Sequence, residues 1–126
     1  MAQLVIAIDF DGTCVTHEYP YMGSDIGAVP VLKELTDAGY HLVLNTMRSG
    51  KTEKEAVKWF KDNDIPLYGV NKNPDQKSWS ASPKVYADLY IDDSALGVPL
   101  TSSPTSTRPY VDWVRVREWL VTEGYL

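Results

Sequence analysis

The sequence predicts an α/β domain in which helices cover a mostly parallel sheet in a three-layer, Rossmann-like arrangement. The first apolar run, Leu4–Ile8, is continuous, which is typical of a strand covered on both faces of a parallel sheet. Segments with helical spacing separate the later apolar runs, and this alternation favours parallel pairing with right-handed crossovers. The length of 126 residues suits one domain, so residues 1–126 are expected to form a single unit.

The segment after the first strand predicts a loop, a helix and a second strand. Residues 14–27 contain proline and glycine and are loop-like. The apolar residues that then recur at helical spacing are Val29, Leu32 and Leu35. Gly39 is the residue expected to close this helix, because glycine is favoured just beyond a helix end. Tyr40–Asn45 follows as the second strand.

A second helix and a third strand are predicted next. Thr52 and Glu55 have the spacing of a capping box, which marks the start of a helix. The side chains that this helix is expected to bury are Ala56, Val57, Trp59 and Phe60. The helix should end before Pro66, and Leu67–Val70 predicts a short strand.

The second half of the chain predicts one more strand and a final helix. Residues 71–83 are polar and irregular, and Leu89–Ile91 is the fourth strand. Residues 99–109 carry three prolines and predict a loop. The last helix is expected over residues 110–123, with a buried stripe formed by Val114, Trp119 and Leu120.

Composition and charge exclude several classes of protein. The formal net charge is −5 and no cluster of lysine and arginine stands out, so tight nucleic-acid binding is not expected. The sequence contains no stretch of about 18 uninterrupted apolar residues, so it predicts no membrane span. Cys14 is the single cysteine and cannot form an internal disulfide, and Met1–Gln3 lead into the first strand without a basic leader. A cytoplasmic location is therefore expected.

Polar residues follow three of the predicted strands, at the edge where parallel sheets bind ligands. They are Asp9 and Asp11 after the first strand, Thr46 and Arg48 after the second, and Asp92 and Asp93 after the fourth. Four carboxylates at one edge would repel one another unless a cation lies among them, and hard oxygen ligands suit Mg²⁺. Because Mg²⁺ keeps waters and binds phosphate oxygens, the pattern favours a phosphorylated substrate.

These residues resemble the motifs of the haloacid dehalogenase-like (HAD) phosphohydrolases. The string Asp9–Thr13 (Asp-Phe-Asp-Gly-Thr) is similar to the first motif of that family, and Thr46 to the second. Lys84 is similar to the third motif, and the pair Asp92 and Asp93 to the acidic fourth. The resemblance runs through the whole chain in the order of the motifs.

The resemblance implies a phosphatase that acts through an aspartyl-phosphate. Asp9 would be the nucleophile, and Asp11 would protonate the leaving group and later activate water. The residues that would hold Mg²⁺ are Asp9, Asp11, Asp92 and Asp93, with Asp11 contributing its backbone carbonyl oxygen. Asp92, which comes first off its strand, is the preferred first ligand of the fourth-motif pair.

The resemblance and the loop positions also imply contacts to the phosphoryl group. Thr46 would donate a hydrogen bond to it, and Lys84 would neutralise its charge. The backbone of Met47 and the side chain of Arg48 are further candidates, because turns after strands supply anion-binding donors. The full set of expected substrate-binding residues is Gly12, Thr46, Met47, Arg48 and Lys84.

Neither gap between the motifs has room for a folded cap domain, so the resemblance implies a small, open member of the family. Its substrate would be a phosphorylated small molecule or macromolecule. Trp79 in the polar loop is the best candidate for an exposed aromatic residue near the substrate, and an open site invites a homo-oligomer. His17 is another candidate for substrate contact.

Two other interpretations remain. A HAD-like protein could bind Mg²⁺ and a phosphorylated ligand without turnover. A receiver domain of two-component signalling also combines an acidic pair with a threonine and a lysine. In a receiver, the phosphoacceptor ends a strand in the middle of the chain, whereas here the middle strands end at Asn45 and Val70, without an aspartate.

Overall fold

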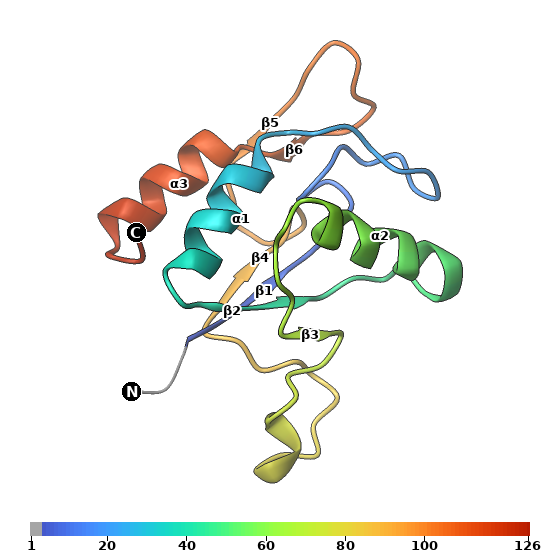
Figure 1. Cartoon of the computed structure of the whole chain (residues 1–126). Coiled ribbons are helices and arrows are strands. Elements are labelled where there is room, and N and C mark those ends of the chain that lie inside the picture. Colours follow the sequence, from blue (N-terminus) through green and yellow to red (C-terminus); the bar gives the residue numbers. More distant parts are fainter. Residues whose placement is uncertain (1–3) are drawn as a thin grey trace.

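The computed structural model describes residues 4–126 and contains a four-stranded sheet with helices packed on it (Figure 1). The strands are β1 (Val5–Ile8), β2 (His41–Leu44), β3 (Gly69–Val70) and β4 (Leu89–Ile91). Their order is β3-β2-β1-β4, and all three pairs are parallel. The predicted α/β fold with a parallel sheet is therefore confirmed.

The two faces of the sheet are covered differently. Ile6 and Ile8 belong to a large core that also contains apolar residues of α1 (Ala28–Asp37), α2 (Gly50–Asp62) and α3 (Trp113–Thr122). Ala7 points to the opposite face and packs in a smaller core with Val85 and neighbouring residues. The connections from β1 to β2 and from β2 to β3 place α1 and α2 on one face, and the return connection to β4 covers the other. That connection is irregular apart from one 3-10 turn, η1 (Gln76–Ser78).

The first two helices begin and end close to the predicted positions. Gly39 lies just beyond α1 with φ 97°, the left-handed conformation expected of a closing glycine. The capping box predicted for α2 is wrong, because the helix begins at Gly50 after Ser49. The Thr52 hydroxyl instead donates to the Ser49 carbonyl oxygen at 2.9 Å, inside the first turn.

The C-terminal part of the chain differs most from the prediction. Residues 99–109 are not only a loop: β5 (Leu100–Thr101) pairs antiparallel with β6 (Tyr110–Val111), so the segment forms a hairpin. The helix α3 then begins at Trp113, after an Asp112 cap. The predicted buried stripe is wrong at two of three positions, because Val114 is 72% exposed and Trp119 is 44% exposed. The buried residues of α3 are Trp113, Val116 and Leu120.

Within residues 4–126, no helix is long and apolar enough to cross a membrane. The expectation about a leader rests on residues 1–3, which lie outside the described residues.

Candidate functional site

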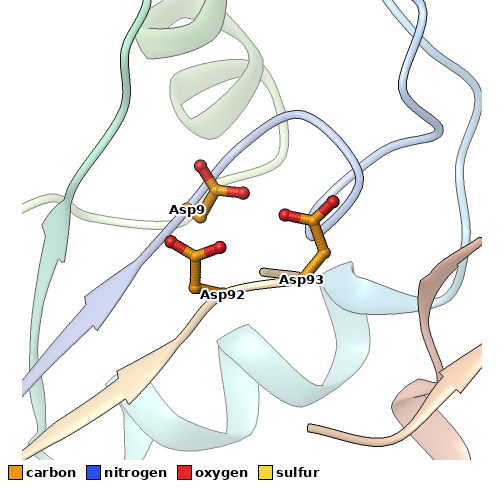
Figure 2. Close-up of side chains that lie close together, drawn as sticks. All are labelled: Asp9, Asp92 and Asp93. Carbon is orange, nitrogen blue, oxygen red and sulfur yellow. The ribbon is translucent and has the colours of Figure 1, made fainter. Parts of the chain in front are cut away.

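Three carboxylates converge at the C-terminal edge of the sheet. Asp9 directly follows β1, and Asp92 and Asp93 directly follow β4, which is the neighbouring strand. Each offers an oxygen atom, and these oxygens all lie within 4.8 Å of one another. Figure 2 shows the three side chains pointing toward a shared space. The predicted convergence of the first and fourth acidic motifs is therefore present, and we call these three residues the acidic cluster.

Thr13 joins the two strands of the acidic cluster. Its hydroxyl donates to Asp9 Oδ2 at 2.8 Å and accepts from the Asp93 amide at 3.0 Å. Its own carbonyl oxygen accepts from the buried Trp113 indole N–H at 2.7 Å. Thr13 belongs to the first motif, where the sequence assigns it no role, and no sequence motif marks Trp113. A buried threonine that both donates and accepts fixes the two acidic segments relative to each other.

Gly12 permits the close approach of Asp93. Its φ of +80° is a conformation that favours glycine, and a Cβ atom built on it would lie 2.3 Å from an Asp93 carboxylate oxygen. The Gly12 carbonyl oxygen accepts from the Val111 amide at 3.0 Å, which ties this turn to β6. Gly12 therefore shapes the acidic cluster, in addition to any contact with substrate.

Burial changes the protonation of the acidic cluster. Desolvation by the surrounding protein, reinforced by the charges of Asp92 and Asp93, raises the pKa of Asp9 to about 8. Burial likewise raises the pKa of Asp93. A site that disfavours bare negative charge this strongly is suited to a cation.

The donor set fits Mg²⁺. Carboxylate oxygens are the hard ligands that Mg²⁺ prefers, and two oxygens on opposite sides of the ion are about 4.2 Å apart. The oxygens of the acidic cluster lie within 4.8 Å of one another, a range that includes this separation. Asp9, Asp92 and Asp93 would hold the ion, whereas the side chain of Asp11 is not part of the cluster.

Asp11 is paired with Arg48. The Arg48 guanidinium donates to both Asp11 carboxylate oxygens, each at 2.8 Å, and it also donates to the Tyr21 carbonyl oxygen at 2.8 Å. The side chain of Arg48 is buried and stacks 5.1 Å from the centre of the Phe10 ring. The phosphate contact predicted for the Arg48 side chain is therefore absent from this arrangement, because the guanidinium is bound to Asp11 and to the Tyr21 carbonyl oxygen. The metal contact expected of the Asp11 backbone carbonyl stays a prediction.

The residues after β2 line the same cavity as the acidic cluster. The Thr46 amide donates to Asn71 Oδ1 at 2.8 Å, and the Thr46 hydroxyl accepts from the Arg48 amide at 3.1 Å. Met47 is 97% exposed at the cavity rim. The structure therefore brings Thr46, Met47 and Arg48 to the site, as predicted from their position at a strand end.

Lys84 and Trp79 lie apart from the acidic cluster. Lys84 precedes β4, whereas Asp92 and Asp93 follow it, so the lysine lies toward the opposite end of the strand. Its ammonium group lies 5.6 Å from the centre of the Tyr90 ring. It lines a separate pocket with Trp79, which is 58% exposed. The predicted contributions of Lys84 and Trp79 to the site are not found, because the connection that carries them covers the far face of the sheet.

The cavity at the acidic cluster has a volume of about 450 Å³. Besides residues already described, it is lined by His17, Tyr19, Ser94 and Arg108. His17 was a candidate from sequence, and the structure brings it to the site. Arg108 was overlooked, because it lies in a proline- and serine-rich segment where no motif marks it.

The chain is similar to one solved structure of a conserved protein from Bacteroides thetaiotaomicron. The two are 34% identical in sequence, with a TM-score of 0.78, over 98% of this chain and 93% of the other. No protein-family model and no curated protein matches the chain. The chain therefore belongs to the same family as this conserved protein.

Proposed function

We propose that the protein is a Mg²⁺-dependent phosphohydrolase that cleaves phosphomonoesters through an aspartyl-phosphate on Asp9. The observation that carries the proposal is the convergence of Asp9, Asp92 and Asp93 at the C-terminal edge of a parallel sheet, beside an open cavity. The resemblance of Asp9–Thr13 to the first HAD motif supports the same chemistry. The substrate is a phosphorylated small molecule or macromolecule, and the net charge of −5 disfavours nucleic acid.

Asp9 is held in a suitable position for attack. The Thr13 hydroxyl binds Asp9 Oδ2, which restricts rotation of the carboxylate and leaves the other oxygen as the attacking atom. That oxygen forms a bond to phosphorus while the bond from phosphorus to the leaving oxygen breaks. Water then attacks the same phosphorus, which releases phosphate and restores Asp9. When bound, Mg²⁺ offsets the negative charges of the carboxylates and the phosphoryl group.

Asp11 is the proposed proton donor to the leaving oxygen. Its carboxyl lines the same cavity as Asp9, two residues further along the chain. Arg48 donates a hydrogen bond to each of the two Asp11 carboxylate oxygens. One of these hydrogen bonds must therefore break, so that Asp11 can contact the leaving oxygen and donate a proton to it. The proton that it gives up is replaced from the water that attacks in the second step.

Hydrolysis of p-nitrophenyl phosphate, with Mg²⁺ and with EDTA, tests the proposal. The unmutated protein should release p-nitrophenol only with Mg²⁺, and Asp9→Asn should abolish the release. Asp62→Asn is the matched control, because Asp62 lies on the exposed surface of α2, where it pairs with Lys58. Full activity of Asp9→Asn would overturn the assignment of the nucleophile.

One observation favours a second candidate, a non-catalytic protein that binds Mg²⁺ and a phosphorylated ligand. The bidentate pair with Arg48 occupies both carboxylate oxygens of Asp11, which opposes its use as a proton donor because neither oxygen is free to contact a leaving group. This candidate predicts Mg²⁺-dependent binding of inorganic phosphate, measured by calorimetry, with no turnover of any ester. Turnover that depends on Asp9 would exclude it.

A further inference from the structure

Arg108 lies at the acidic cluster although it is far from it in the sequence. It belongs to the turn that joins β5 to β6, and it lines the cavity together with Asp9, Asp92 and Asp93. The guanidinium is exposed, and it forms no ion pair with any residue of the described range 4–126. Its charge is therefore available to a ligand.

The other positive groups near the site do not have this freedom. Arg48 also lines the cavity, but its guanidinium is committed to Asp11 and to backbone carbonyl oxygens. Lys84 lies in a different pocket, beside Trp79 and Tyr90. Among the residues described as lining the cavity, Arg108 is thus the one arginine or lysine whose charge is uncommitted.

The base of the hairpin that carries Arg108 is fixed to the site. Leu100 pairs with Val111, and the Val111 amide donates to the Gly12 carbonyl oxygen at 3.0 Å. Gly12 belongs to the turn that packs against the Asp93 carboxylate. Arg108 comes three residues before Val111, so it lies close in sequence to the anchored base of the hairpin.

Arg108 brings a positive charge to the cavity into which the carboxylates of the acidic cluster face. A phosphoryl group that enters the cavity would bring further negative charge to the same place. It would need a cation in addition to any metal ion.

We propose that Arg108 binds the phosphoryl group of the substrate and supplies the positive charge that the family resemblance assigned to Lys84. This inference rests on the proposed function, since it concerns the same site. Guanidinium matches phosphate with two parallel hydrogen bonds, which a lysine ammonium cannot reproduce. The position of Arg108 on a hairpin turn leaves its long side chain free to reach an incoming phosphate.

Kinetics with p-nitrophenyl phosphate and inhibition by inorganic phosphate test this role. Arg108→Ala should raise KM and the inhibition constant of phosphate by about tenfold or more, as expected for loss of hydrogen bonds to a charged group. Arg108→Lys should recover part of the loss, because it restores the charge without the two-pronged geometry. Arg115→Ala is the matched control, an exposed arginine on α3 whose loss should change neither constant.

Two results would overturn the proposal. If Arg108→Ala has the same KM and the same inhibition constant of phosphate as the unmutated protein, the guanidinium does not bind phosphate. If Lys84→Ala weakens phosphate binding and Arg108→Ala does not, the lysine binds the phosphoryl group instead. The melting temperature of each variant shows that it is folded.

Calorimetry with Mg²⁺ and inorganic phosphate separates this proposal from the proposed function. If the unmutated protein binds phosphate but hydrolyses no ester, the proposed hydrolase fails while Arg108 is still tested by the binding of its alanine variant. If the unmutated protein is active and Arg108→Ala binds phosphate equally well, only the role of Arg108 fails. If the unmutated protein neither binds phosphate nor hydrolyses an ester, both fail.

Discussion

The Arg48 guanidinium holds the Asp11 carboxylate through two hydrogen bonds of 2.8 Å each. The pair joins the turn after β1 to the segment after β2, and the Arg48 side chain is buried while that of Asp11 is 12% exposed. Arg48 also donates to the carbonyl oxygens of Tyr21 and Thr52, at 2.8 and 3.3 Å. The arginine that lines the site therefore organises the loops around it.

Loss of Arg48 should destabilise the protein strongly. Arg48→Ala leaves the Asp11 charge buried and unpaired, and we expect a loss of about 3–5 kcal/mol in the free energy of unfolding. The double variant Arg48→Ala with Asp11→Ala should be more stable than Arg48→Ala alone, because no orphaned charge remains. Urea denaturation measures both. Equal stability of Arg48→Ala and the unmutated protein would show that the pair contributes nothing to folding.

In the absence of metal, stability should fall as pH rises from about 5 to 8. The folded protein raises the pKa of Asp9 from 3.8 to about 8, so it binds a proton that the unfolded chain has released in this range. Because the folded state then holds more protons, the stability gained by protonation is present at low pH and lost toward pH 8. The slope is at most about 1.4 kcal/mol per pH unit for one proton.

Urea unfolding in EDTA at several pH values measures this dependence. Asp9→Asn should remove most of the slope and should be more stable than the unmutated protein at pH 8. A smaller slope of the same sign should remain, because burial also raises the pKa of Asp93. Stability that increases with pH in EDTA would contradict the desolvation of Asp9.

The acidic cluster could be predicted from sequence because its residues directly follow strands. Parallel pairing of β1 with β4 brings Asp9 and Asp92 to one edge, whatever the loops do. Lys84 was harder to place, because it lies in an irregular connection whose path depends on which face of the sheet it covers. The spacing between Lys84 and Asp92 along the chain carries no information about that face.

Long-range hydrogen bonding explains the other differences. Nothing near Trp113 in the sequence indicates that its indole N–H donates to the Thr13 carbonyl oxygen, 100 residues earlier. The hairpin of β5 and β6 is equally hard to predict, since its strands have two residues each and prolines surround them. Arg108 reaches the site only through that hairpin.

The predicted homo-oligomer stays a prediction, although Trp79 does not lie beside the acidic cluster as first expected.

Gly12→Ala should disrupt the acidic cluster. The added Cβ would lie 2.3 Å from an Asp93 carboxylate oxygen, so the carboxylate must move, and the positive φ adds strain. Gly97→Ala is a matched control, because its φ is +89° and its Cβ would meet no atom within 4 Å. We expect both variants to lose stability by about 1–2 kcal/mol or more from strain. Only Gly12→Ala should also lose Mg²⁺ affinity, measured by calorimetry, and equal affinities in the two variants would refute this account.

Mg²⁺ should raise the melting temperature of the protein without any substrate. Asp9, Asp92 and Asp93 converge in the folded state and not in the unfolded chain, so an ion that they bind stabilises by mass action. A hundredfold excess over the dissociation constant corresponds to about 2.7 kcal/mol, or roughly 10 °C for a domain of this size. Differential scanning fluorimetry with and without Mg²⁺ measures the shift.

Variants of single carboxylates identify the source of that shift. Asp92→Ala should lose most of it, since one ligand of the ion is gone, while its melting temperature in EDTA should rise because repulsion within the acidic cluster is relieved. Asp62→Asn, on the surface of α2, should keep the full shift. Ca²⁺ should also stabilise the protein yet support less turnover, because its looser coordination positions the phosphoryl group poorly. If millimolar Mg²⁺ leaves the unmutated melting temperature unchanged, the acidic cluster is not a magnesium site and the proposed hydrolase loses its main support.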